Sequence, residues 1–275
     1  MAKTAIATNF RLPNAPLAEV VFELRWKLVG DAGLPPPLHT DPGLIPALST
    51  FTTEAAKLGF NATRDMSRPQ ETGAFGVVRR YFRAPDQAFP LLQLGPGIFA
   101  SNQSSDYYWE SFKRQTLDGA RALLASYPIL EGYPLTPVHL ELRYIDVFDK
   151  SLLGTTDLFK FLAMGTTLHV QLPPILDSKL FGSGLSGRLL WQAPVRGQKN
   201  TIFSFDIGSG TKNKEEIVRL QTKVLTTGDS VPKPSGHAPF IRDIARWLDM
   251  AHDVTSPFFK AFVTDNIMKK FSAEV

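Results

Sequence analysis

Hydrophobic and polar residues alternate along two short segments of the chain that have nearly the same sequence. The first reads PLAEVVFELRW at 16–26, and the second reads PLTPVHLELRY at 134–144, 118 positions later and without a gap. Alternation with a period of two is typical of a β-strand with one buried face. The positions expected to be buried are Val20, Phe22, Leu24, Trp26 and Leu28 in the first segment, and Val138, Leu140, Leu142 and Tyr144 in the second.

The opposite positions of both predicted strands carry charge in the same Glu-x-Arg order. They are Glu23 and Arg25 in the first strand, and Glu141 and Arg143 in the second. Burial of five large apolar side chains stabilises a fold by on the order of 10 kcal/mol, whereas an unpaired buried ion costs about several kcal/mol. We therefore expect the apolar face to meet the core, and Glu23 and Arg25 to face water, a partner or a cleft.

Between the two segments the pattern predicts a helix, several strands and a second helix. Apolar residues at helical spacing favour a helix over 44–58, closed by Gly59. Residues 74–83 and 88–102 are expected to form strands, with a turn or bulge at Gly95-Pro96-Gly97. Asp106 is a suitable N-cap for a following helix that ends near Ser126.

The same order of elements returns after the second segment. A short helix is expected over 157–164, and an apolar stripe over 240–251 predicts a long helix near the end. Ser256-Pro257 predicts a break before a last helix. The strand candidates between these helices are 166–172, 187–194, 200–208 and 215–227, with GQKN and GSGTKNK as hairpin turns.

This repetition predicts an internal duplication. The halves, 1–130 and 131–275, each contain a strand, a helix, three or four antiparallel strands and a long helix, and we expect them to pack as one compact unit. The predicted fold class is α+β, with curved antiparallel sheets and helices on one face, as in helix-grip or TATA-binding-protein-like saddles. Chance similarity of two amphipathic strands is the alternative, because the match is short.

Composition narrows the classes of protein. The chain of 275 residues is 43% hydrophobic and has no cysteine, which excludes disulfides, iron–sulfur clusters, Cys-ligated zinc and a thiol nucleophile. The N-terminal residues lack the apolar run of a signal peptide, and no run approaches the ~20 residues that span a bilayer. We therefore expect a cytoplasmic protein without membrane contact. The net charge of +4 and pI ≈ 9.2 permit an anionic partner.

No motif for a cofactor, a metal or a catalytic set is complete, and none of these is predicted. GSGLSG at 182–187 matches G-x-G-x-x-G, but a strand pattern follows it where a dinucleotide site needs a helix. The five histidines show no metal-ligand spacing. His252 is the most interesting because it is expected near a helix end, where the dipole favours its charge. A capping or packing role is the preferred interpretation, and a catalytic role is the alternative.

Two groups of charged residues are candidate binding sites. If the halves are related by a pseudo-twofold axis, Glu23, Arg25, Glu141 and Arg143 meet at the sheet centre and could bind an anion or a peptide. The preferred interpretation is two ion pairs on a solvated face, each worth about 0–1 kcal/mol, and the binding site is the alternative. The second group is the densest basic run, Arg79, Arg80 and Arg83, which is a candidate for contact with nucleic acid.

The chain resembles a family of sporadically distributed, uncharacterised bacterial proteins of about this length. The resemblance covers essentially the whole chain. It is carried by NAPLAEVVFELRW, GPGIFASNQSSDYYWESFK, HLELRYIDVFD and the closing WLDMAHDVTSPFFKAFVTDNIMKKF. The family has no established activity, so the resemblance implies no catalytic residues. Its patchy distribution implies an accessory role in bacterial defence or mobile-element loci.

The leading functional hypothesis is a non-enzymatic binding or sensor module that acts through its polar sheet face or through oligomer contacts. Its partner would be a protein or an anionic small molecule, and a homodimer is one form of such contact. The first alternative is a hydrolase or nucleotide-handling enzyme whose site is assembled from separated strands. The second is a nucleic-acid-binding saddle, whose affinity would fall as salt rises.

Overall fold

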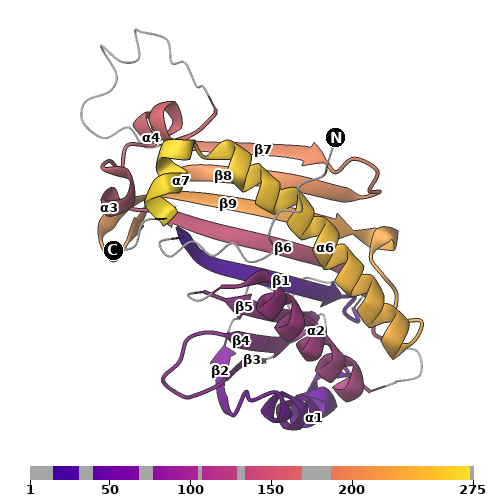
Figure 1. Ribbon diagram of the computed structural model, residues 1–275. Helices are drawn as coiled ribbons and strands as arrows, with labels where there is room; N and C mark the ends of the chain where they lie inside the picture. The colour runs from indigo at the N-terminus through magenta and orange to yellow at the C-terminus, as the bar shows by residue number, and fades with distance from the viewer. Residues whose placement is uncertain are drawn as a thin grey trace.

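The computed structural model describes residues 15–30, 40–67, 77–104, 107–128, 134–168 and 187–272. The fold is α+β, as predicted, and all strands belong to one nine-stranded antiparallel sheet that does not close into a barrel (Figure 1). The strands are β1 Leu17–Trp26, β2 Ala62–Ser67, β3 Val77–Phe82, β4 Leu91–Gly95, β5 Ile98–Gln103, β6 Pro137–Phe148, β7 Arg188–Pro194, β8 Thr201–Lys212 and β9 Glu215–Thr227.

The two matching segments of the sequence are neighbouring strands at the centre of this sheet. The strand order is β2-β3-β4-β5-β1-β6-β9-β8-β7, so β1 and β6 pair with each other. In their antiparallel register Phe22 lies opposite Leu142, Glu23 opposite Glu141, and Leu24 opposite Leu140. Apolar residues therefore face apolar residues across the pair, and the two glutamates face each other on the opposite side of the sheet.

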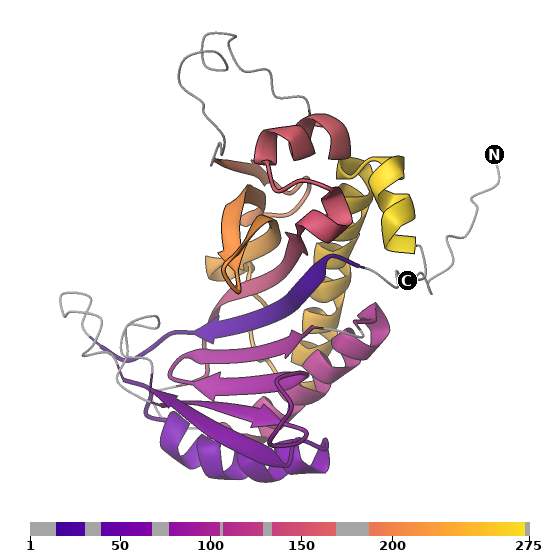
Figure 2. The same cartoon turned by 90° about the vertical axis from the view of Figure 1, so that its left-hand side faces the viewer.

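Helices cover the apolar side of the sheet. α2 and α6 lie across one face, and the view turned by 90° shows both on the same side of the strands (Figures 1 and 2). The helices are α1 Leu44–Lys57, α2 Trp109–Ser126, α3 Lys150–Leu153, α4 Leu158–Gly165, α6 His237–Phe262 and α7 Asp265–Ser272, with a 3-10 turn at η2 Gly228–Ser230.

Aromatic side chains hold the helices on the central strands. The buried ring of Phe22 makes edge contacts with Phe99 of β5 at 6.4 Å and with Trp247 of α6 at 6.1 Å. The indole Nε1 of Trp247 donates a hydrogen bond of 2.8 Å to Thr226 Oγ1 on β9. The alternating residues of β1 thus bury one face against α2 and α6. Glu23 and Arg25 lie on the opposite face, on which no helix of the described ranges packs, and we call this the helix-free face.

A second core cluster lies around the far end of β6. Phe148 packs on Phe161 of α4 with ring centroids 4.8 Å apart, and Phe205 of β8 packs on Phe258 of α6 at 5.2 Å. This cluster corrects the predicted helix break, because α6 continues through Pro257 to Phe262. A proline inside a helix costs about 3 kcal/mol, which the burial of the flanking phenylalanines against β8 offsets.

Several local predictions need correction. β8 extends to Lys212, so only Asn213 and Lys214 of the predicted GSGTKNK turn form the turn, with φ of 52° and 71°. β2 was not predicted, because its sequence ATRDMS has no apolar alternation. The short helix α3 was not predicted either. Of the strand predicted over 166–172, Thr166 forms an isolated bridge to Val263, and residues 169–172 lie outside the described residues.

Other predictions agree with the structure or fall outside it. The helices predicted over 44–58 and 157–164 are α1 and α4, and Asp157 caps α4 through the amides of Phe159 and Lys160. α2 begins at Trp109 with Tyr108 as its N-cap residue, while Asp106 lies outside the described residues. So do residues 182–186 of GSGLSG. Within the described ranges, no helix has the length and apolarity to cross a bilayer.

Candidate functional site

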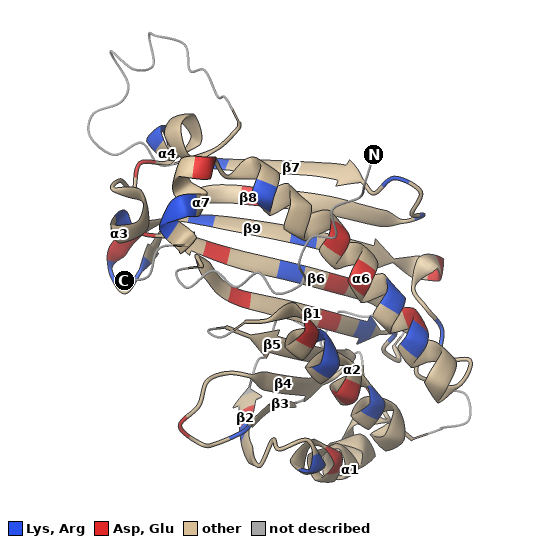
Figure 3. Ribbon diagram, viewed as in Figure 1, with Lys and Arg blue, Asp and Glu red and all other residues tan. Residues whose placement is uncertain are grey.

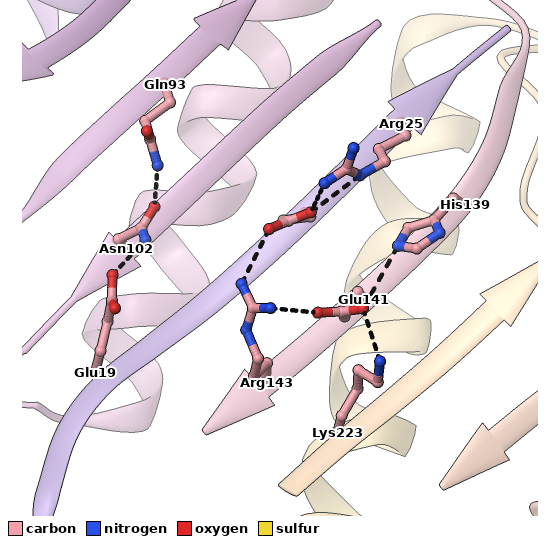
Figure 4. A network of polar contacts seen from close by, with 9 residues as sticks. Glu19, Arg25, Gln93, Asn102, His139, Glu141, Arg143 and Lys223 are labelled. Carbon is pink, nitrogen blue, oxygen red and sulfur yellow. Dashed lines mark hydrogen bonds and ion pairs between the residues drawn. The ribbon is translucent and has the colours of Figure 1, made fainter. Parts of the chain in front are cut away.

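The face of the sheet without helices carries a network of charged side chains at its centre. Acidic and basic residues lie next to one another on β1, β6 and β9 (Figure 3). Glu23 of β1 contacts Arg25 of the same strand and Arg143 of β6. In close view, Arg143 lies beside Glu141 of β6, and Lys223 approaches Glu141 from β9 (Figure 4). The two Glu-x-Arg pairs, which were expected to meet if a pseudo-twofold axis relates the halves, lie next to each other at the sheet centre. We call Glu23, Arg25, His139, Glu141, Arg143 and Lys223 the central network.

Arg143 connects the two glutamates. Its Nη2 donates to Glu23 Oε1 at 3.1 Å, and its Nη1 lies 3.3 Å from Glu141 Oε1. Arg25 donates to the other oxygen of Glu23 from Nε at 3.0 Å and from Nη2 at 2.7 Å. The single carboxylate of Glu23 is thus bonded by guanidinium groups from two strands, Arg25 at one oxygen and Arg143 at the other, which makes the ion pairs stronger than isolated surface pairs.

Glu141 is surrounded by three basic groups. Besides Arg143, Lys223 Nζ lies 3.5 Å and His139 Nε2 lies 3.7 Å from its Oε2 atom. Burial by itself raises the pKa of Glu141, but His139 together with the charges of Arg143 and Lys223 outweighs that effect. The pKa of Glu141 therefore lies below its usual value, and the side chain is an anion at neutral pH.

The charges of the central network are layered. The side chains of Glu23 and Glu141 are only 12% and 7% exposed, whereas those of Arg25, Arg143 and Lys223 are 34%, 27% and 26% exposed. Of the three surroundings expected for Glu23, which were water, a partner or a cleft, the low exposure of its side chain excludes open water. The face presents cations to the outside and keeps its carboxylates beneath them.

The same arrangement recurs towards the β7 edge. Asp206 of β8 is buried, and it accepts hydrogen bonds from Arg188 Nε at 2.7 Å and Nη2 at 2.6 Å. Arg219 of β9 lies 3.7 Å from the same carboxylate, and both arginine side chains are largely exposed. Cations therefore form the accessible layer here as well.

On the other side of the central network, neutral amides continue the polar contacts towards β3. Asn102 of β5 donates to Glu19 Oε1 at 2.6 Å and accepts from Gln93 of β4 at 3.0 Å. Gln93 in turn accepts from Arg80 Nε of β3 at 3.0 Å. A row of hydrogen-bonded side chains thus links β1 to β3 on the same face as the central network. Figure 4 shows the part of this row from Glu19 to Gln93.

The basic run at Arg79, Arg80 and Arg83 does not form one patch. Arg79 bonds Asp65 of β2 at 2.6 Å and 2.9 Å, while its neighbour Arg80 bonds Gln93 from the opposite side of β3. Arg83 lies over the ring of Phe60 at 5.5 Å. Alternation along β3 places Arg79 and Arg80 on opposite faces, and of the three arginines Arg80 is the one that joins the polar row.

His252 lies in the middle of α6, which corrects the expectation that it sits near a helix end. Its ring stacks on Trp109 at 4.0 Å, and its Nδ1 hydrogen-bonds the hydroxyl of Tyr144 at 2.9 Å. The Tyr144 hydroxyl also bonds that of Tyr107 at 2.9 Å. Burial lowers the pKa of His252 to about 4, so the ring is neutral at physiological pH. The packing role preferred from the sequence agrees with this position.

Three charged residues of the sheet were not predicted as candidates from the sequence. They are Lys223 and Asp206, which belong to the ion pairs of the polar face, and Asp146, which is buried. Lys223 and Asp206 belong to charged strands that were recognised, but their partners lie on other strands. Asp146 follows the alternation of β6 onto the helix side, where burial raises its pKa to about 7. The sequence does contain a sign of this burial, because Asp146 has the same position in the alternation as the apolar residues Leu142, Tyr144 and Phe148.

Over the described residues, no group of three or more His, Asp or Glu side chains is arranged to hold a metal ion. Comparison with known proteins also gives no assignment. No protein-family model, no curated protein and no solved structure matches the chain.

Proposed function

We propose that the protein is a non-enzymatic binding module whose helix-free sheet face binds an anionic group of a partner, such as an acidic protein segment. The observation that carries this proposal is the layering of charge in the central network. An approaching anion meets the exposed ends of Arg25, Arg143 and Lys223 before it meets the buried Glu23 and Glu141. An accessory role in a defence or mobile-element locus, implied by the family resemblance, would suit such a module.

Unsatisfied polar atoms in the network support the same proposal. Among the described residues, His139 Nε2, Glu141 Oε1 and Arg143 Nε are buried without a hydrogen-bond partner. Glu141 Oε1 and His139 Nε2 are held by ion pairs of 3.3 Å and 3.7 Å that do not have hydrogen-bond geometry. These side chains therefore have hydrogen-bonding capacity that a ligand at this place can use.

We also propose that the two halves arose by duplication, in a saddle-like layout. Support comes from the register of β1 and β6, in which Glu23 lies opposite Glu141, its own counterpart 118 positions later. On both sides of the centre the first strand of the half is followed outward by strands in descending chain order, β1-β5-β4-β3 and β6-β9-β8-β7, and β2 is one additional strand at the edge of the first side. A pseudo-twofold axis through the glutamates would make the site a product of the duplication.

Binding of a glutamate hexapeptide tests the proposed function. We expect Arg25→Gln and Lys223→Gln each to weaken the affinity at least about ten-fold, since each removes a charge-assisted contact of the accessible layer. Isothermal titration measures the dissociation constants. Arg246→Gln, an equal charge change on an exposed part of α6, is the matched control and should leave the affinity unchanged. Equal losses in all three variants would mean that only net charge matters.

Nucleic acid is the second candidate partner, because the accessible cations extend from Lys223 to Arg219 and Arg188 across three strands. A fluorescent single-stranded DNA oligonucleotide, titrated at several salt concentrations, separates the two candidates. A DNA ligand would bind more tightly than the hexapeptide, with a logarithmic salt dependence that reflects several phosphate contacts. DNA binding that is weaker than peptide binding at every salt concentration would remove this candidate.

A further inference from the structure

The edge strand β7 exposes large apolar side chains on both of its faces. Trp191 is 61% exposed and Leu190 is 58% exposed, and these two residues point to opposite sides of the sheet. β7 is the last strand in the sheet order, and its outer edge pairs with no strand in the described part of the chain (Figure 1). An exposed apolar edge of this kind is a surface for strand pairing.

The backbone of β7 defines which groups are free to pair. Ser209 N donates to Gly187 O at 3.0 Å, and Val195 N donates to Thr201 O at 2.9 Å. In an antiparallel pair these bonds alternate, so the odd-numbered residues of β7 bond β8. The N–H and C=O groups of Arg188, Leu190 and Gln192 therefore point outward.

The side chains on this edge continue the protein core and carry little unbalanced charge. Trp191 packs on Phe205 with ring centroids 5.8 Å apart, and Phe205 belongs to the second core cluster. The one charged residue of β7, Arg188, is paired with the buried Asp206. The core thus reaches the edge at Trp191, and a partner strand there would need to be apolar and uncharged at its centre.

The opposite edge of the sheet does not offer such a strand. β2 carries Arg64 and Asp65 at its centre, both exposed, and its outer edge would place charges against Trp191 and Leu190. A contact between β2 and β7 of successive copies would also be head-to-tail and could extend without closing. β7 itself has the neutral, apolar centre that the edge requires.

We propose that β7 pairs antiparallel with β7 of a second copy of this chain, in a closed dimer with its twofold axis at Leu190. In this register Leu190 lies opposite Leu190 of the second copy, Arg188 lies opposite Gln192, and Trp191 lies opposite Leu189. All outward N–H and C=O groups of Arg188, Leu190 and Gln192 are then bonded. Like charges do not meet, and Pro194, which has no N–H, stays outside the ladder.

A single introduced cysteine tests both the contact and its register. The chain has no cysteine of its own, so a disulfide in Leu190→Cys can form only between two copies. Paired strands hold directly opposite Cα atoms about 5.5 Å apart, within the range for a disulfide. We expect Leu190→Cys to form a covalent dimer under mild oxidation, seen on a non-reducing gel. The control is Ile45→Cys on α1, which is 76% exposed and far from β7. Cross-linking of Leu190→Cys no faster than that of the control would overturn the proposal.

Sedimentation velocity tests the unmodified contact. We expect the wild-type protein to sediment as a dimer, and Trp191→Lys to weaken the dimer at least about ten-fold, because lysine on an edge strand opposes pairing. Ile45→Lys should remain dimeric. Circular dichroism checks that both variants are folded. A wild-type protein that stays monomeric at the highest soluble concentration would overturn the proposal, whatever its affinity for anions.

Discussion

Replacing Arg143 with leucine is expected to lower the free energy of unfolding by about 1–3 kcal/mol, the cost of depriving buried polar groups of one partner, because Glu23 keeps Arg25 and Glu141 keeps Lys223. Arg143 is the group that bonds both Glu23 and Glu141, whose side chains are 12% and 7% exposed. Without it, two carboxylates that lie directly opposite each other on neighbouring strands lose their shared cation. Urea denaturation monitored by tryptophan fluorescence measures the change.

A double variant identifies the cause of that loss. Glu141→Gln combined with Arg143→Leu removes one of the two carboxylates that have lost Arg143. We therefore expect the double variant to be more stable than Arg143→Leu alone. The two substitutions should therefore be non-additive, as expected for groups in one network. A loss below about 1 kcal/mol for Arg143→Leu is what a solvated surface pair would give, and it would contradict the buried position of the glutamates.

Substitutions of Asp146 and His252 are expected to change the pH dependence of stability in opposite directions. Burial raises the pKa of Asp146 to about 7, so between about pH 4 and 7 the folded state keeps a proton that the unfolded state releases. The free energy of unfolding therefore falls as pH rises through this window, by about 4 kcal/mol in total.

For His252 the sign is reversed. Burial lowers its pKa to about 4, so between about pH 6.5 and 4 the unfolded state binds a proton at His252 and the folded state does not. The free energy of unfolding therefore falls as pH falls, by about 3 kcal/mol in total. In the wild-type protein the two contributions oppose each other over the same range, and their sum varies little between about pH 4 and 6.5.

Single variants separate these two contributions. Asp146→Asn should be more stable relative to wild type at pH 8 than at pH 4, and His252→Phe should show the opposite trend while keeping a flat ring on Trp109. Urea denaturation from pH 4 to 8 gives both curves. The difference from wild type is the quantity to compare, because carboxylates such as Asp65 and Asp149 titrate equally in all three proteins. Parallel curves for all three would show that neither group is buried as described.

The central strands could be predicted from the sequence because one face of each strand must be apolar to pack on the core, while the other face can carry charged residues. Phe22, Leu24, Leu140 and Leu142 alternate with charged residues, and only one phase of that alternation can meet the core. The antiparallel class and most helices follow from similar local patterns. β2 was not predicted because an edge strand gains little from burial and tolerates Arg64 and Asp65.

The composition of the site could be predicted only in part. Glu23, Arg25, Glu141 and Arg143 were recognisable because the same Glu-x-Arg order occurs twice. Lys223 could not be assigned to Glu141, since this requires the register of β6 against β9, which no local pattern encodes. The depth of the glutamates was also hidden, because the arginines that cover them belong to the same predicted polar face. Pro257 was misleading for a similar reason, as distant packing on Phe205 keeps α6 continuous.

The arginine side-chain signals in a nitrogen–proton correlation spectrum test the central claim most directly, that an anion binds to the cations above the two glutamates. During titration with the glutamate hexapeptide, the Nε–Hε signals of Arg25 and Arg143 should shift together and saturate with one dissociation constant, while that of Arg246 should stay in place. Saturable binding of the peptide that leaves the signals of Arg25 and Arg143 unmoved would contradict the account.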